Sequence, residues 1–209
     1  MKQSGKMAEM RHTIPMPILL SICVGIGLSA ACGFRVFLPL FALGLAGKLG
    51  YVPLNDDFQW LASTPALIAL GVATACEILA YFIPFVDHLL DTMASPMAVI
   101  AGVVATAAVL TNDTNPWLQW SLAIIAGGGV AAATQTSTVL LRGLSTLTTA
   151  GLGNPLFALG EFVLSALVSI LTLVFPFMIA GLVLAVLLVI FLRLRKTNGN
   201  PKREYTPVN

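Results

Sequence analysis

Four ionisable residues lie inside long apolar stretches of this sequence: Arg35, Glu77, Arg142 and Glu161. A charge left unpaired in a lipid bilayer costs from a few to more than about 10 kcal/mol, so such side chains pair with one another or contact water or a ligand. One interpretation is that the two arginines and two glutamates pair inside a helix bundle. The other is that they line a polar pathway, in which Arg35 binds an anionic ligand or pairs with Glu77. Arg35 and Glu77 are the stronger candidates for a pathway.

Polar residues recur at intervals of three, four or seven around these charges, which places them on single helical faces. The three stripes are Thr74, Glu77, Tyr81 and His88; Thr134, Thr138, Arg142, Ser145 and Thr149; and Asn154, Glu161, Ser165, Ser169 and Thr172. Such stripes face protein or water rather than lipid. Either they line a substrate or proton pathway, or their hydroxyls hold helices together. The candidate pathway residues are Arg35, Glu77, Tyr81, Thr134, Thr138, Arg142, Glu161 and Ser165.

The stretch PFVDHLLDT places Asp87 and Asp91 four residues apart, with His88 beside the first aspartate. Two carboxylates and an imidazole can bind a divalent cation or relay protons, and the alternative is a solvated turn at the membrane edge. The sequence contains no nucleophile elbow, phosphate loop or HExxH motif, so we expect no cofactor. The cysteines lack CxxC spacing and are expected to be small core residues; they are Cys23, Cys32 and Cys76.

The composition requires these residues to be positioned by membrane helices. Of 209 residues, 57% are hydrophobic and only 10% are charged, and the mean hydropathy is +0.92. At about 20 residues per crossing, the apolar region has room for about six spans and for no separate catalytic or nucleic-acid-binding domain. The apolar segments are 14–47, 62–85, 94–110, 117–150, 155–174 and 176–194.

Basic residues cluster on both sides of the apolar region, which predicts that both termini are cytoplasmic and that the number of crossings is even. They are Lys2, Lys6 and Arg11 on one side, and Arg193, Arg195, Lys196, Lys202 and Arg203 on the other. Residues 48–61 and 111–116 then face the exterior, while 86–93 and 143–154 face the cytoplasm. Residues 1–13 form a cytoplasmic segment, 14–194 the transmembrane domain and 195–209 a disordered cytoplasmic tail.

Segments 14–47 and 117–150 are too long for simple crossings. A straight helix of 34 residues reaches about 50 Å, whereas the hydrocarbon core is about 30 Å thick. Each segment must therefore tilt strongly, break or partly re-enter. The glycine-rich stretches GIGLSAACGF and AGGGVAAATQ permit a break in each.

The two long segments also resemble each other. GLSAACGFRVFLPL from Gly27 aligns without gaps with GGVAAATQTSTVLL from Gly128. Further along each half, STPALIALG from Ser63 corresponds to GNPLFALGE from Gly153. The similarity predicts two repeats, 14–110 and 117–194. Because each repeat has three helices, the second is inverted in the membrane, a plan common among secondary transporters.

Three runs carry a family resemblance: GLSAACGFRVFLPLFALGLAG, EILAYFIPFVDHLLDTMASPMAVIAG and AIIAGGGVAAATQTSTVLLRGLSTLTTAGLGNP. They resemble the bacterial membrane family known as domain of unknown function 4126, over a range from about Ile18 to Leu192. The resemblance implies a polytopic protein of the bacterial inner membrane. It supplies no substrate and no catalytic residues.

We therefore predict an all-α membrane protein of about six transmembrane helices, built as two inverted three-helix repeats with long broken first and fourth helices. The expected function is a small secondary transporter or ion-permeation protein with a polar site at the repeat interface. Two alternatives stay open: an integral-membrane enzyme or lipid-handling protein that uses Asp87, His88 and Asp91, and a structural scaffold. The expected partners are the lipid bilayer, a small solute or ion and a second copy of the chain, without nucleic acid.

Overall fold

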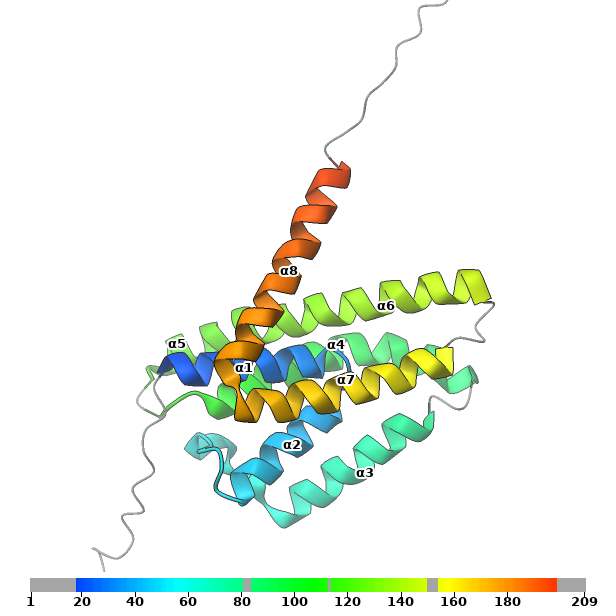
Figure 1. The fold of residues 1–209 in the computed structure, drawn as a ribbon. Helices are drawn as coiled ribbons and strands as arrows, with labels where there is room; N and C mark the ends of the chain where they lie inside the picture. The colour runs from blue at the N-terminus through cyan, green and yellow to red at the C-terminus, as the bar shows by residue number, and fades with distance from the viewer. Residues whose placement is uncertain (1–17, 81–83, 113, 150–153, 199–209) are drawn as a thin grey trace, which may run out of the picture.

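The described part of the chain is helical (Figure 1). The computed structural model describes residues 18–80, 84–112, 114–149 and 154–198. No strand occurs within these ranges, in agreement with the predicted all-α class. The elements are α1 (Ile18–Cys32), α2 (Phe37–Lys48), the 3-10 helix η1 (Asp56–Ala62), α3 (Thr64–Ala80), α4 (Pro84–Val109), α5 (Pro116–Leu122), the π-helical stretch η2 (Ala123–Gly128), α6 (Gly129–Thr149), α7 (Asn154–Val174) and α8 (Pro176–Asn198).

Several of these helices suit a membrane. Three described stretches are long and apolar enough to cross one: Pro116–Ser145, Leu156–Val174 and Pro176–Arg193. A fourth crossing is possible if η1 and α3, which meet at a bend of 63°, act as one span. The apolar helices α1 and α2 are shorter than a span. The protein is therefore membrane-embedded, while six crossings and an inverted repeat are not confirmed.

The first apolar segment starts with α1 running antiparallel to α4. Gly25 packs against Thr106, where a Cβ added to the glycine would lie 2.8 Å from the threonine methyl group. One turn further along α1, Ser29 Oγ donates a hydrogen bond of 2.9 Å to the carbonyl of Gly102, one turn earlier on α4. The beginning of α1 therefore lies toward the C-terminal end of α4.

The segment then breaks after Cys32 and returns as α2. The backbone N–H of Asn55, beyond the end of α2, donates a 2.8 Å hydrogen bond to the carbonyl of Ala108 near the end of α4. The α1–α2 pair is thus a helical hairpin whose two outer ends lie at the same end of the bundle, as Figure 1 shows. We call residues 33–36 the hairpin tip. The sequence prediction placed residues 48–61 on the opposite side of the membrane from the N-terminus, which requires the first apolar segment to cross. In the structure the first apolar segment folds back instead.

The fourth segment keeps a continuous helical path from Pro116 to Thr149, with a π-helical stretch but without the predicted break. Gly127 serves close packing instead. A Cβ added to Gly102 of α4 would lie 2.8 Å from the carbonyl oxygen of Gly127. Gly127 therefore brings this helix against α4, and the expectation of two broken helices is correct only for the first.

Other boundaries also differ from the sequence prediction. Helix α4 begins at Pro84, so residues 86–93 are helical rather than a turn, because proline is well suited to the first position of a helix. Helix α8 extends to Asn198, past the predicted boundary at 194, and leaves the bundle at a steep angle (Figure 1). Cys32 is buried as expected, whereas Cys76 is exposed. The predicted segment 1–13 and the remainder of the tail, 199–209, lie outside the described residues.

Candidate functional site

The hairpin tip lies among α3, α6 and α7, with Arg35 only 2% exposed. Gly33 allows this position because it lies directly against α6. A Cβ added there would be 2.5 Å from the Cβ of Thr134 and 2.8 Å from the carbonyl oxygen of Ala131. A side chain at residue 33 would push the tip away from α6, so glycine determines how deeply the hairpin inserts.

Glu77 of α3 caps the N-terminus of α2. Its Oε1 accepts a 3.0 Å hydrogen bond from the backbone N–H of Val36, and its Oε2 accepts one of 3.3 Å from Phe37. Val36, at the N-cap position, provides no side-chain cap of its own. The first N–H groups of a helix lack partners within it, and the positive end of the helix dipole favours a carboxylate. A buried side chain of another helix therefore completes α2.

Arg35 points from the tip toward α7. Its Nη2 donates a 2.5 Å hydrogen bond to the carbonyl of Ala158 and lies 3.7 Å from Oε2 of Glu161. The expected partner of Arg35 was Glu77, and in the structure the nearer carboxylate is that of Glu161. The reason is geometric, because both oxygens of Glu77 face the backbone of α2.

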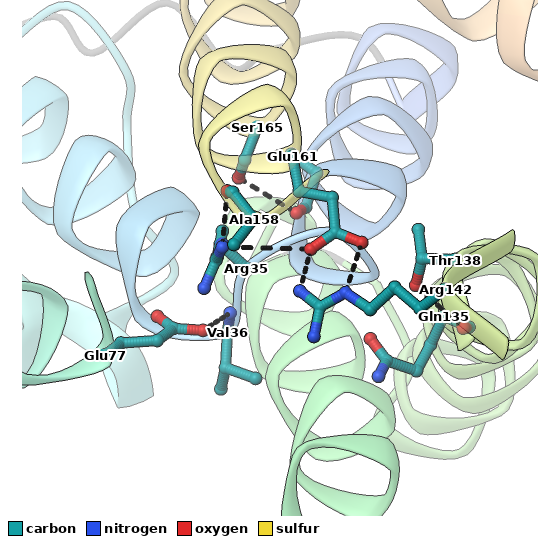
Figure 2. A network of polar contacts seen from close by, with 10 residues as sticks. Arg35, Val36, Glu77, Gln135, Thr138, Arg142, Ala158, Glu161 and Ser165 are labelled. Carbon is teal, nitrogen blue, oxygen red and sulfur yellow. Dashed lines mark hydrogen bonds and ion pairs between the residues drawn. The ribbon is translucent and has the colours of Figure 1, made fainter. Parts of the chain in front are cut away.

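Arg142 of α6 and Glu161 of α7 form a buried bidentate ion pair (Figure 2). Nε of Arg142 donates a 2.9 Å hydrogen bond to Oε1 of Glu161, and Nη2 donates to Oε2. Both side chains are 8% exposed. Two parallel charge-assisted bonds fix this geometry. Glu161 therefore lies between two arginines, and we call Arg35, Glu77, Arg142 and Glu161 the charged centre.

A small pocket of about 10 Å³ adjoins the charged centre. That volume is about what one water molecule needs. The pocket collects residues from the hairpin tip and from α3, α4, α6 and α7. They are Phe34, Val36, Glu77, Ala94, Gln135, Thr138, Val139, Arg142 and Glu161. Carboxylate, guanidinium, amide and hydroxyl groups thus meet in one place, where they can exchange protons or bind a small polar species.

Comparison with known proteins identifies a family. A family model described as "Domain of unknown function (DUF4126)" matches residues 22–196, which include the whole charged centre. The chain belongs to this family. No curated protein and no solved structure matches it. Any function of this member of the DUF4126 family must therefore be argued from the site.

The structure brings most of the predicted pathway residues to the charged centre or next to it. Thr138 borders the pocket and Thr134 does not, although the hydroxyl of each donates to a carbonyl of its own helix, that of Gln135 and that of Val130 respectively. Ser165 donates a 3.0 Å hydrogen bond to the carbonyl of Ala31, just before the tip. Tyr81 lies outside the described residues. Position and partners therefore divide the predicted residues into pocket and packing groups.

The predicted stripe on α6 agrees with the burial pattern. Its members from Thr134 to Ser145 are buried, whereas Val139, Leu140 and Leu147 are exposed. The corresponding residues of α7 are also buried; they are Glu161, Ser165, Ser169 and Thr172. Side chains at Thr149 and Asn154 are not described. One polar face of each helix therefore points into the bundle.

The predicted metal residues lie on the first turns of α4, at Asp87, His88 and Asp91. Their side chains are outside the described part of the structure. Among the described residues, no group of three histidine, cysteine, aspartate or glutamate side chains could hold a metal ion. A metal site at residues 87–91 therefore stays a hypothesis.

Sequence reasoning missed several members of the site. Gln135 borders the pocket and precedes Thr138 and Arg142 by three and seven residues, so helical spacing could have identified it. The backbone N–H of Val36 and the carbonyl of Ala158 have no side-chain signal at all. Their participation follows only from the fold of the hairpin against α3 and α7.

Proposed function

We propose that the protein is a small membrane transporter or ion-permeation protein whose polar site is the pocket at the hairpin tip. The observation that carries this proposal is that the pocket lies at a helix break and is lined by charged side chains of three other helices. Glu77 of α3, Arg142 of α6 and Glu161 of α7 line the space beside residues 33–36. Interrupted helices with their ends at a polar site are a recurring plan of secondary transporters.

The energetics of the membrane support a transport role. Ionisable residues at membrane depth are expensive and usually face a substrate or ion pathway. The charged centre has two residues of each sign, so it holds no net formal charge and has room for about one water molecule beside it. We interpret this arrangement as the closed state of the pathway.

The hairpin gives the pathway a direction. Helices of 15 and 12 residues reach only about 22 and 18 Å, less than the hydrocarbon thickness. The tip therefore ends inside the bilayer, and the opposite end of the bundle provides the shorter route to the pocket. We propose that solute enters from that side, where α4 and α7 begin and α6 ends.

We also propose a bacterial inner membrane as the location, with a cytoplasmic N-terminus favoured by Lys2, Lys6 and Arg11. The lipid bilayer is the expected partner of the exposed apolar residues on α6 and α8, among them Leu144, Leu147 and Leu188. A second copy of the chain is the other expected partner for these surfaces. If the N-terminus is cytoplasmic, residues 49–55 are cytoplasmic too.

A scaffold role is the second candidate, and the bidentate Arg142–Glu161 pair favours it. In a scaffold the only role of this ion pair is to join α6 and α7, and no water reaches it. The two functions differ in whether water enters the pocket during function. Solvent access at Thr138 therefore distinguishes them.

The test uses single cysteines in a chain in which Cys23, Cys32 and Cys76 are replaced by serine, reconstituted in liposomes. The Thr138→Cys variant should react with a small membrane-impermeant thiol reagent, because residue 138 borders the pocket. The matched control is Val130→Cys, on the same helix but away from the pocket and buried, which should stay unlabelled. Protection of both positions, with both variants folded, would exclude the transport proposal and favour the scaffold.

A further inference from the structure

The contacts of Glu77 suggest which ion is coupled to transport. Resting on the function proposed above, we infer that the coupling ion is a proton, that Glu77 binds it, and that binding releases the hairpin tip. One side chain, one ligand and one moving element are thereby assigned to the pathway.

The two glutamates of the charged centre differ in their partners. Glu161 accepts from Arg142 through both oxygens and has Arg35 at 3.7 Å. The hydrogen bonds of Glu77 come from the backbone N–H groups of Val36 and Phe37. Neutralising Glu161 would break the bidentate pair with Arg142 and remove the carboxylate 3.7 Å from Arg35, whereas neutralising Glu77 alters mainly the end of α2. Glu77 is therefore the carboxylate that can change its charge at the lower cost.

Charged and titratable groups face Glu77 from several elements. They are Arg35 at the tip, Arg142 on α6, Glu161 on α7 and Cys32 at the end of α1. Helix α4 contributes Ala94 to the same pocket. The two arginines favour the ionised carboxylate, whereas removal of the buried side chain from water favours the protonated one. A movement of the tip changes both contributions, and this links proton binding at Glu77 to the position of the tip.

The pocket fits a proton better than a metal ion. A metal cation needs several oxygen ligands, and both oxygens of Glu77 already accept from backbone N–H groups. A proton needs one carboxylate lone pair and a water molecule to deliver it, and the volume of about 10 Å³ holds about one water. The chemistry of the site thus selects the smallest cation.

Proton binding would weaken the cap of α2. A hydronium ion in the pocket transfers its proton to one carboxylate oxygen, which forms an O–H bond, and a water molecule is left. The protonated oxygen becomes a donor, so it no longer accepts well from the N–H of Val36 or Phe37. The negative charge at the positive end of α2 is lost as well. The tip is then free to move away from α3.

The first experiment detects the proton directly. In a chain with isotope-labelled glutamate, the infrared difference spectrum between pH 8 and pH 5 should contain a carboxylic-acid band of a glutamate shielded from water. The band should be absent from Glu77→Gln and, because aspartate is unlabelled, from Glu77→Asp. If the band persists in both variants, Glu77 is not the proton site. The band is expected in the unmodified chain whether or not the variants fold. Absence of the band from the unmodified chain would overturn the inference.

The second experiment measures release of the tip. Cys32 is fully buried beside the tip, so its labelling rate reports opening in a background with Cys23→Ser and Cys76→Ser. At one fixed pH, Glu77→Gln should increase the rate about fivefold or more, the factor expected from loss of a helix cap. The matched control is Thr74→Val, one turn earlier on the buried face of α3, whose hydroxyl donates to Leu70 within α3. Equal rates for all three chains would overturn the proposed release.

The outcomes separate the inference from the function on which it rests. Solvent access at Thr138→Cys without a glutamate band or a change at Cys32 would remove the role of Glu77 and leave a polar pathway. Protection at Thr138→Cys would remove the pathway and with it the coupling. Proton movement down an imposed pH gradient in liposomes that contain the unmodified chain, and its loss in the Glu77→Gln variant, would support both the transport function and the role of Glu77.

Discussion

Arg142 and Glu161 join α6 to α7 through two parallel hydrogen bonds inside the bundle, with each side chain 8% exposed. The pair is not isolated, because the Arg35 guanidinium lies 3.7 Å from the same carboxylate. Removing either partner leaves a buried charge with less compensation than before. The charged centre therefore contributes to folding whatever it does in transport.

Arg142→Leu should lower the free energy of unfolding by about 3–5 kcal/mol, because Glu161 loses its bidentate partner in a buried environment. Thermal unfolding in detergent measures the change. The double variant Arg142→Leu/Glu161→Leu should lose less than the sum of the single variants, since the two residues interact directly. Asp57→Asn, an exposed change in η1, is the control and should have little effect. Additive losses in the double variant would contradict a direct interaction.

Gly33→Ala should displace the hairpin tip and destabilise the fold by about 1–3 kcal/mol, because the new methyl group would meet α6 backbone at 2.8 Å. The melting temperature should fall accordingly. Gly129→Ala is the matched control, since an added Cβ has no neighbour within 4 Å there and alanine favours the helix. A wild-type melting temperature for Gly33→Ala would mean that the tip does not lie against α6.

Cysteines at Leu19 and Tyr51 should be labelled from the same side of the membrane. Both residues are exposed and lie near the outer ends of the hairpin. The measurement compares an impermeant thiol reagent added to right-side-out and inverted vesicles, in a background without the native cysteines. Labelling from opposite sides would show that the first apolar segment crosses the membrane. Leu147→Cys, near the other end of α6, serves as the reference for the opposite side.

The three tryptophans should all report a membrane–water interface. Trp60 lies in η1, and Trp117 and Trp120 lie in α5; Phe58 of η1 contacts Trp120 with ring centroids 6.3 Å apart. Tryptophan prefers the headgroup region. Lipids brominated near the headgroup should therefore quench the fluorescence more than lipids brominated deep in the acyl chain. Stronger quenching by the lipids brominated deep in the acyl chain would instead place η1 and α5 inside the hydrocarbon core.

The sequence was sufficient to predict the apolar helices and the faces of α6 and α7 that turn inward. Those properties are local, since hydropathy and spacings of three or four residues determine them. Pro84 illustrates the limit of local reasoning. It lies near the end of the apolar segment 62–85, although proline equally suits the start of a helix, and α4 begins there.

The hairpin could not be predicted because its cause is distant in the sequence. A long apolar segment with a glycine can continue, kink or return, and the choice depends on what surrounds it. Here Glu77 supplies the cap that α2 needs, from 41 residues beyond Val36. The same holds for the pairing of charges: four residues allow several pairs, and the packing of α3, α6 and α7 decides that Glu161 faces both arginines.

The long-range contacts of the hairpin have a consequence for biosynthesis. The partner of Arg35 at Ala158 lies 123 residues later in the chain. At about 5–20 residues per second, a ribosome needs roughly 6–25 s to translate that interval. During this time the hairpin cannot span the bilayer, and Arg35 lacks the Ala158 carbonyl that it contacts in the folded protein. We therefore expect the hairpin to stay at the membrane surface and to enter only after α7 has been inserted, so that an early segment is the last to reach its final position.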